Sequence, residues 1–518
     1  MSVIRHSTIS SALVSALVLG TVALAAPAAA ATEPCSVFFD ADGDGHDDLA
    51  VGTAGEDVST TRLHPDAGAV TIVKGDAQGR FGSSGSEQLT QESLGMVSQD
   101  GDRFGAVVAS ADLDGDGCGD LAIGMPGQHH AAGAVVVVYG TPTGLDTAHP
   151  QLLRQGAAPV GGSAEAGDGF GSALTVAGGL PTGGAAQLWV GAPGEDVGST
   201  KDAGVVTELS GATGSLVGSA GATTFRQGAS GVPGSAESGD RFGERLSGGL
   251  RRVLVGVPHE DIGSKKDAGL VYVFGVSSQG WATYSQDSAG MPGTAEAGDV
   301  FGSSLAQAAG CGQADETWVI GASREDIGSA RNAGSVTLWD RGTRKGATVS
   351  QGVGGVPDTS ESGDTFGATM VTTTVDGGMV AIGAPGEDTA GDADSGTITS
   401  IALDCRAGAP AVASASTWTQ GSTMAGSRNP GNRFGAALGA SLVTVDTGDA
   451  MRLVVGAPGQ SDGGQARSGT VTVLTVGDLG PVTSGSVAFG QGTAGIAGDP
   501  GVDDGFGGSL DATNALVL

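Results

Sequence analysis

Short apolar runs alternate with glycine-rich turns along nearly the whole chain. Runs such as VVVVYG and VLVGV are rich in β-branched residues and end at Gly, Pro, Asp or Asn. This pattern predicts short strands that are joined by tight turns. After residue 31 no stretch has sustained helical periodicity, so we expect an all-β protein.

The predicted strands recur in units that begin roughly 60 to 75 residues apart. One landmark of the unit is an apolar residue and Gly followed by a turn, as in WVGAPGED. Seven copies of it begin at Ala50, Ala122, Trp189, Leu254, Val319, Ala381 and Val454. A second landmark is G-D-x-F-G, which begins at Gly101, Gly167, Gly239, Gly298 and Gly363, with variants at Gly431 and Asp503.

A unit of three or four short strands cannot bury both faces of its sheet alone. Packing the units face to face buries those surfaces, and closing them into a ring removes the outer edges. Seven units therefore predict a seven-bladed β-propeller. The first unit lacks an F-G segment, and the last F-G segment lacks a following unit. We expect these N- and C-terminal segments to complete one shared blade and so close the ring.

The succession F-G, D-x-D-G-D-G-x-x-D-L, V-G-A-P and G-x-V-x-V-x resembles the FG-GAP repeat. That repeat builds the N-terminal propeller of integrin α chains, and secreted bacterial proteins that contain it are similar. The resemblance covers about Cys35 to Leu518. It implies seven blades of four antiparallel strands around a central axis.

Two loops carry carboxylates at the first, third, fifth and ninth positions of a short segment. The candidate ligands are Asp40, Asp42, Asp44 and Asp48 in the first loop and Asp112, Asp114, Asp116 and Asp120 in the second. At the seventh position, His46 and Cys118 are expected to contribute their backbone carbonyl oxygens. Carboxylates this close repel one another, and Ca²⁺, which binds 6 to 8 oxygen ligands, removes the repulsion.

We therefore predict two calcium sites, with two solvated acidic turns as the alternative. The loops begin like an EF-hand loop but lack its glutamate at the twelfth position and its flanking helices. The FG-GAP resemblance implies calcium binding by loops between strands. The later units lack D-x-D-G-D-G, so only these two sites are expected. Mg²⁺ fits less well because it demands near-octahedral geometry.

The N-terminal residues indicate export. Arg5 and His6 precede an apolar stretch and an A-x-A sequence near Ala29 to Ala31. We interpret residues 1–31 as a secretory signal peptide, with a retained anchor as the alternative, and residues 32–518 as the propeller. No later segment is long and apolar enough to span a bilayer, so a secreted, extracellular protein is expected.

The four cysteines can form two disulfides in an oxidising exterior. Three connectivities are possible, and we favour Cys35 with Cys118 and Cys311 with Cys405. The alternative is that one or more of the cysteines stays free and buried.

Charge and motifs narrow the function classes. A formal net charge of -32 argues against a nucleic-acid partner, because phosphate would be repelled. Neither G-x-S-x-G nor H-E-x-x-H occurs, so no catalytic residue is predicted. A Glu-Asp pair follows the apolar-Gly landmark in five units. Because it is repeated, we interpret it as a turn device whose side chains cap backbone N–H groups.

We expect a non-catalytic extracellular module for recognition or cell adhesion, as the integrin-like resemblance implies. Its partner would be a protein or a glycan, bound through loops on one face. A lectin is the first alternative, although aromatic residues make up only 4% of the chain and few can stack on sugars. A hydrolase is the second, because some FG-GAP proteins accompany phospholipase domains. The oligomeric state stays open.

Overall fold

The fold is known from a computed structural model. It describes residues 35, 39–179, 185–211, 221–276, 280–308, 317–373, 378–404, 408–421, 424–445, 448–477 and 480–511. The signal peptide predicted at residues 1–31 and the pairing predicted between Cys311 and Cys405 lie outside these residues.

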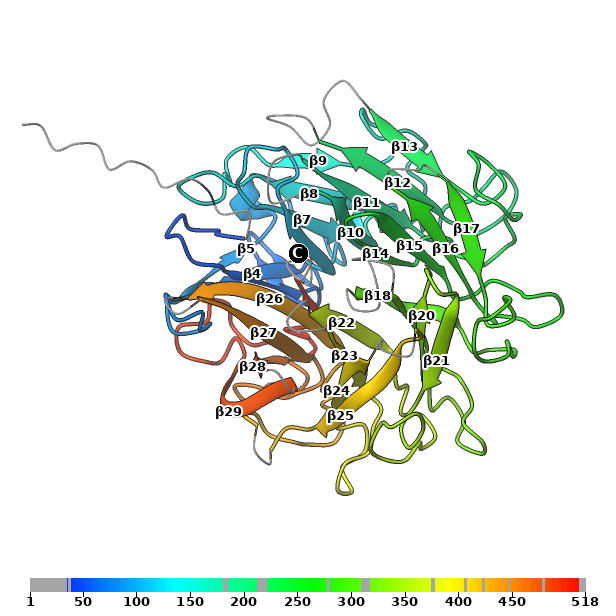
Figure 1. The fold of residues 1–518 in the computed structure, drawn as a ribbon. Helices are drawn as coiled ribbons and strands as arrows, with labels where there is room; N and C mark the ends of the chain where they lie inside the picture. Colours follow the sequence, from blue (N-terminus) through cyan, green and yellow to red (C-terminus); the bar gives the residue numbers. More distant parts are fainter. Residues whose placement is uncertain are drawn as a thin grey trace, which may run out of the picture. The chain divides into compact units, whose positions relative to one another are not determined.

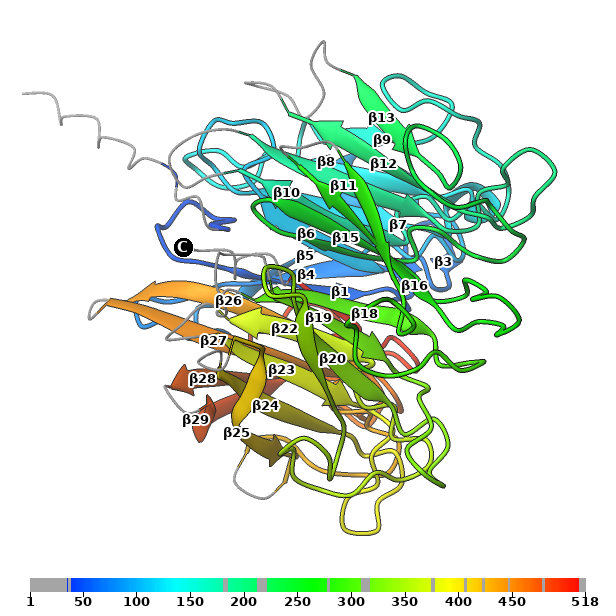
Figure 2. The ribbon, with the colours of Figure 1, turned by 45° about the vertical axis from the view of Figure 1, so that its right-hand side comes forward.

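Seven four-stranded antiparallel sheets, or blades, follow one another around a common axis (Figures 1 and 2). Blade one contains β30 (Ser509–Leu510), β1 (Leu49–Thr53), β4 (Ala69–Val73) and β5 (Ser86–Leu89). Blade two contains β6 (Val107–Ala111), β7 (Asp120–Met125), β8 (Ala134–Val138) and β9 (Gln151–Leu153). Blade three contains β10 (Ala173–Gly178), β11 (Ala186–Ala192), β12 (Val205–Ser210) and β13 (Ala222–Phe225).

The other four blades repeat this order. Blade four contains β14 (Arg245–Gly248), β15 (Arg252–Val257), β16 (Leu270–Gly275) and β17 (Trp281–Tyr284). Blade five contains β18 (Phe301–Ala308), β19 (Thr317–Ala322), β20 (Ser335–Asp340) and β21 (Lys345–Val349). Blade six contains β22 (Thr369–Thr373), β23 (Met379–Ala384), β24 (Thr397–Asp404) and β25 (Ala411–Trp418). Blade seven contains β26 (Ala437–Val445), β27 (Gly448–Ala457), β28 (Thr470–Gly477) and β29 (Gly480–Phe489).

The first strand of every blade lies innermost, since it contacts the first strands of both neighbouring blades. This arrangement confirms the predicted all-β, seven-bladed propeller. Helical structure is confined, among the described residues, to a 3₁₀ turn at Glu92–Leu94 and a short turn, α1, at Gln128–Ala131. No helix in this part of the chain is long and apolar enough to cross a membrane.

The two ends of the chain close the ring in a single blade. Strand β30 pairs with β1 through Val51 opposite Leu510 and Gly52 opposite Ser509. The C-terminal segment thus supplies the inner strand of the blade whose other three strands come from the N-terminal segment. The predicted shared blade is confirmed, because β30 takes the place that an F-G strand has in the other six blades.

Apolar residues fill the spaces between neighbouring blades. The phenylalanine of each F-G pair is fully buried, and the set is Phe104, Phe170, Phe242, Phe301, Phe366, Phe434 and Phe506. Three of the five tryptophans, Trp189, Trp318 and Trp339, are also fully buried. The core is therefore spread over the seven interfaces between neighbouring blades, which we call seams. This arrangement suits a sequence with few large side chains.

The landmark glycines let neighbouring blades approach closely. A Cβ added at Gly124 would lie 2.3 Å from the carbonyl oxygen of Gly171, the F-G glycine of the next blade. The corresponding distances at the other six seams are 2.1 to 2.4 Å. No real Cβ tolerates such a contact, so a side chain here would force two blades apart.

Candidate calcium sites

The first acidic loop leads directly into β1. Carboxylate oxygens of Asp40, Asp42 and Asp48 lie within 4.8 Å of one another. Asp40 receives hydrogen bonds at both oxygens, from the backbone N–H groups of Gly43 and Gly45, each at 2.8 Å. Gly43 and Gly45 have positive φ angles, which let the backbone wrap around the first aspartate.

The second acidic loop joins β6 to β7 and has the same internal bonds. Here Asp112, Asp114 and Asp116 bring carboxylate oxygens within 4.8 Å of one another. Asp112 accepts from the N–H groups of Gly115 at 2.6 Å and Gly117 at 3.0 Å. The two loops thus share one backbone conformation, as their matching spacing predicts.

The ninth aspartate of each loop joins it to its own blade. Asp48 accepts from the N–H groups of Ala41 at 2.8 Å and Gly75, just after β4, at 2.9 Å. Asp120 accepts in the same way from Leu113 and from Gly140, just after β8, each at 2.8 Å. These side chains therefore fix the loop against the neighbouring strand. Spacing alone did not reveal this role, because the two glycines lie far from the loops in the sequence.

The predicted ligand sets are only partly brought together. Asp44 lies outside the close group of the first loop, is exposed, and accepts from the N–H of His46 at 2.9 Å. Asp120 lies outside the close group of the second loop. Asp116 accepts from the N–H of Cys118 at 2.8 Å. The carbonyl roles of His46 and Cys118 stay predictions.

Burial and mutual repulsion destabilise the ionised aspartates. Burial raises the pKa of Asp48 to about 7 and that of Asp120 to about 8, against the effect of their backbone hydrogen bonds. Burial, with repulsion by Asp116 and Asp112, raises the pKa of Asp114 to about 6. A divalent cation would relieve this cost, and the donor set consists of carboxylate oxygens, which suit Ca²⁺.

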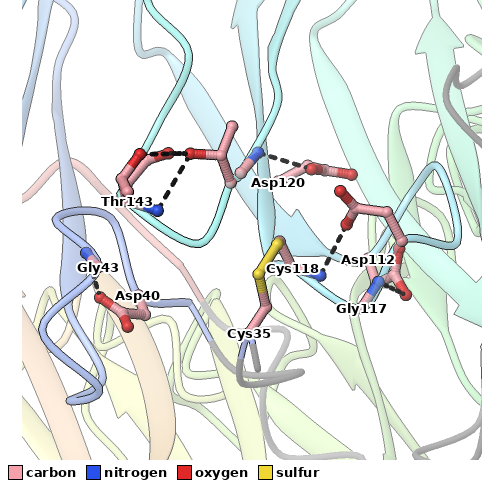
Figure 3. Close-up of a disulfide and its surroundings, with 12 residues drawn as sticks. Cys35, Asp40, Gly43, Asp112, Gly117, Cys118, Asp120 and Thr143 are labelled. Carbon is pink, nitrogen blue, oxygen red and sulfur yellow. Dashed lines mark hydrogen bonds between the residues drawn. A yellow bond between two sulfur atoms is a disulfide. The ribbon is translucent and has the colours of Figure 1, made fainter. Parts of the chain in front are cut away.

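A disulfide between Cys35 and Cys118 ties the two loops together (Figure 3). Cys35 precedes the first loop, and Cys118 is the seventh residue of the second. The pairing that we favoured for these two cysteines is confirmed. A further link comes from the turn after β8, where the N–H of Leu145 donates to the carbonyl oxygen of Ala41 at 3.0 Å.

The two loops differ in one neighbouring side chain. In blade one Lys74 places its Nζ 3.0 Å from Oδ2 of Asp42. In blade two the matching residue, directly before Gly140, is Tyr139, and its hydroxyl donates to Gln151 instead. The first loop therefore already holds one positive charge of the protein, whereas the second has none at that position.

The two residues of each repeated Glu-Asp pair have different partners, which the sequence did not show. The aspartate caps the backbone as predicted: Asp196, for example, accepts from the N–H of Asp202 at 3.0 Å. The glutamate instead receives a glutamine side chain from the preceding blade. Glu195 accepts from Nε2 of Gln155 at 2.7 Å, and its four counterparts have equivalent partners.

Comparison with known proteins finds an FG-GAP repeat at residues 104–138. This segment runs from Phe104 through the second acidic loop to the end of β8. The chain is also similar to the phosphatidylinositol-glycan-specific phospholipase D of Rattus norvegicus, with 40% identity over 99 residues. The matched part is 18% of this chain and 11% of that protein. The chain thus contains an FG-GAP repeat within a seven-bladed propeller, an arrangement that is consistent with an integrin α-like propeller.

Proposed function

We propose that the chain is a secreted, calcium-stabilised propeller that recognises an extracellular protein and has no catalytic activity of its own. The observation that carries this proposal is the pair of acidic loops joined by the Cys35–Cys118 disulfide. Disulfides persist in oxidising surroundings outside the cytosol, and modest calcium affinity suffices where calcium is abundant. Both features suit an extracellular protein.

Calcium would act on the scaffold in this proposal. The close carboxylates Asp112, Asp114 and Asp116 would hold one ion and Asp40, Asp42 and Asp48 the other. The bound cation would neutralise each loop, while Asp48 and Asp120 keep the loops attached to β4 and β8. Because such sites form only in the folded chain, their binding free energy adds to the stability of the propeller.

A protein partner fits the surface better than a glycan. Sugar binding relies on exposed aromatic rings, yet Trp189, Trp318 and Trp339 are fully buried. The net charge of -32 favours a partner with a basic surface. A recess of about 670 Å³ between blades seven and one has acidic residues such as Asp57 and Asp499 in its wall and no basic residue. A basic side chain of the partner would be accommodated there.

A hydrolase is the second candidate, because the similar rat protein is named a phospholipase D. The likeness covers a short part of that protein, so it gives no support for the same reaction here. Assays of the purified protein on phosphodiester, ester and glycoside substrates test this candidate. Turnover that is lost on replacement of one named acid would overturn the non-catalytic proposal.

Binding assays with the purified protein test the recognition proposal. The protein is presented to arrays of purified extracellular proteins and of glycans, in calcium and in chelator. We expect saturable binding to one or more basic proteins, weakened by salt, and none to the glycans. A protein that melts normally and binds only glycans would contradict the proposal.

A further inference from the structure

Each seam between blades contains a polar group of three side chains, at least two of which are buried. At the seam between blades five and six these are Gln351, Glu387 and Asp364, and each is at most 3% exposed. Nε2 of Gln351, from the loop after β21, donates to Oε2 of Glu387. Asp364 accepts from the N–H of Glu361 at 2.5 Å. We call such a group a seam triad.

Four other seams have the same triad, although Glu195, Glu260 and Glu325 are only partly buried. Its members are Gln155, Glu195 and Asp168; Gln227, Glu260 and Asp240; Gln286, Glu325 and Asp299; and Gln491, Glu56 and Asp504. The last of these joins blade seven to blade one across the closure of the ring. The arrangement therefore recurs at five of the seven seams and is a regular part of the connection between neighbouring blades.

The charged groups that act on the glutamate of a triad are acidic, and they include the aspartate of the same triad. The charged groups around Glu387 are Asp364, Asp358 and Glu361, which are all acidic. The other glutamates also have acidic neighbours. These are Glu165, Asp168 and Asp196 for Glu195; Glu237, Asp240 and Asp261 for Glu260; Glu296, Asp299 and Asp326 for Glu325; and Asp57 and Asp504 for Glu56. Tyr272 also contacts the triad of Glu260, and Lys265 lies near Asp299. Two buried like charges so placed are unfavourable unless one is neutralised.

The glutamine of each triad lacks a hydrogen-bond donor. Its Nε2 is used by the glutamate, but its Oε1 is buried and has no partner among the described residues in all five triads. A buried carbonyl oxygen of this kind costs free energy unless a donor reaches it. A protonated glutamate would present an O–H donor beside the same amide group, which an ionised glutamate cannot do.

The two remaining seams carry permanently neutral groups in place of the glutamate. Between blades six and seven, Asn432 and Gln460 replace both acids, and Nδ2 of Asn432 donates to Oε1 of Gln420 at 3.3 Å. Here the glutamine oxygen has its donor. Between blades one and two, Gln128 takes the glutamate position and Gln91 donates to Asp102 at 2.9 Å, while Oε1 of Gln91 has no partner among the described residues, as in the five triads. The chain itself thus shows that a seam closes with an uncharged group at this position.

We propose that each of the five seam triads binds a proton, held as the carboxylic acid of its glutamate. The proton removes the repulsion between the two carboxyl groups and supplies the donor that the glutamine lacks. The contacts that join the blades are then complete in mildly acidic surroundings and lose their protons as the pH rises.

The sign of the pH effect follows from the protonation states. Burial raises the pKa of Glu56, Glu195, Glu260 and Glu325 to about 7 and that of Glu387 to about 8. In the unfolded chain a glutamate has a pKa near its ordinary 4.5, so the folded state binds more protons. This contribution to stability is fully present below about pH 4.5 and is lost as the pH rises through about 7 to 8.

Infrared spectroscopy on protein labelled at the glutamate side-chain carboxyl carbon tests the proposal directly. At about pH 6 we expect the C=O stretch of protonated glutamate, which disappears on titration towards about pH 9. Glu387→Gln should remove about one fifth of that signal, because one of five seam glutamates is lost. Asp388→Asn is the matched control, since this exposed neighbour on the same turn should leave the signal unchanged.

Thermal melting gives an independent readout. With calcium held constant, the wild-type melting temperature should fall between about pH 5 and about pH 8, and Glu387→Gln should reduce this fall. The comparison is repeated in chelator, so that protonation of the calcium loops is separated from that of the triads. Absence of a protonated glutamate signal at about pH 6 in the folded protein would overturn the proposal.

Discussion

Arg452 of β27 in blade seven donates from Nε to the carbonyl oxygen of Gly79 in blade one, at 2.7 Å. Its other nitrogens reach the carbonyl of Gln78 at 2.9 Å and the hydroxyl of Thr475 at 3.0 Å. Arg452 is only 8% exposed, and each of its three guanidinium nitrogens donates to an oxygen atom. This guanidinium therefore holds the last blade against the first, in addition to the β30–β1 pairing.

Replacing Arg452 should weaken the closure of the ring. We expect Arg452→Met to lower the free energy of unfolding by about 1–3 kcal/mol, because the buried carbonyl oxygen of Gly79 and the partly buried one of Gln78 lose their donor. Urea denaturation measures this change. Arg467→Met is the control, since its exposed pair with Asp503 in the same region should contribute little. Equal effects of the two variants would contradict a special role for Arg452.

Calcium should bind at two sites and stabilise the fold. We expect titration calorimetry to give two ions per chain and chelator to lower the melting temperature. Saturation at about a hundred times the dissociation constant adds about 2.7 kcal/mol per site. The double change Asp112→Asn and Asp114→Asn should reduce the stoichiometry to one. Asp394→Asn, on an exposed turn of blade six, should keep both ions. Two ions bound to the double variant would show that the second loop holds none.

Lys74 should weaken calcium binding at the first loop. Its ammonium group forms an ion pair with the carboxylate of Asp42, so a divalent cation that binds this carboxylate must compete with it. We expect Lys74→Met to raise the affinity of the first site roughly two- to fivefold, in line with about 0.3–1 kcal/mol for a partly exposed ion pair. The measurement is made in the Asp112→Asn, Asp114→Asn background, where only the first loop remains. An unchanged affinity would mean that Lys74 does not compete with the ion.

The landmark glycines should tolerate no side chain. We expect Gly124→Ala to cost about 1–3 kcal/mol, because its Cβ would meet the carbonyl oxygen of Gly171. Thermal or urea unfolding measures the loss. Gly161→Ala is the control, since a Cβ there meets nothing within 4 Å and its φ is not positive. A loss confined to Gly124→Ala would assign the effect to blade contact and not to alanine itself.

The sequence by itself determined the features that depend on local pattern. Strand-forming runs and glycine turns indicated the β-blades, and seven copies of the landmarks predicted the number of blades. The overlap of the incomplete first and last units predicted the shared blade that β30 and β1 now form. Spacing within nine residues was enough to predict two acidic loops in which three aspartates lie close together, although Asp44 and Asp120 lie outside those groups.

Only the tertiary structure decided which distant groups meet. It showed that Gly75 and Gly140 donate hydrogen bonds to the ninth aspartates and that Lys74 pairs with Asp42. It also showed that Gln351 donates to Glu387 and Arg452 to Gly79. The physical reason is that strand pairing within a blade, packing of consecutive blades and closure of the ring each bring together residues that lie far apart in the sequence. Burial at those contacts then sets the charge state and partner of each side chain, and no pattern within one unit carries that information.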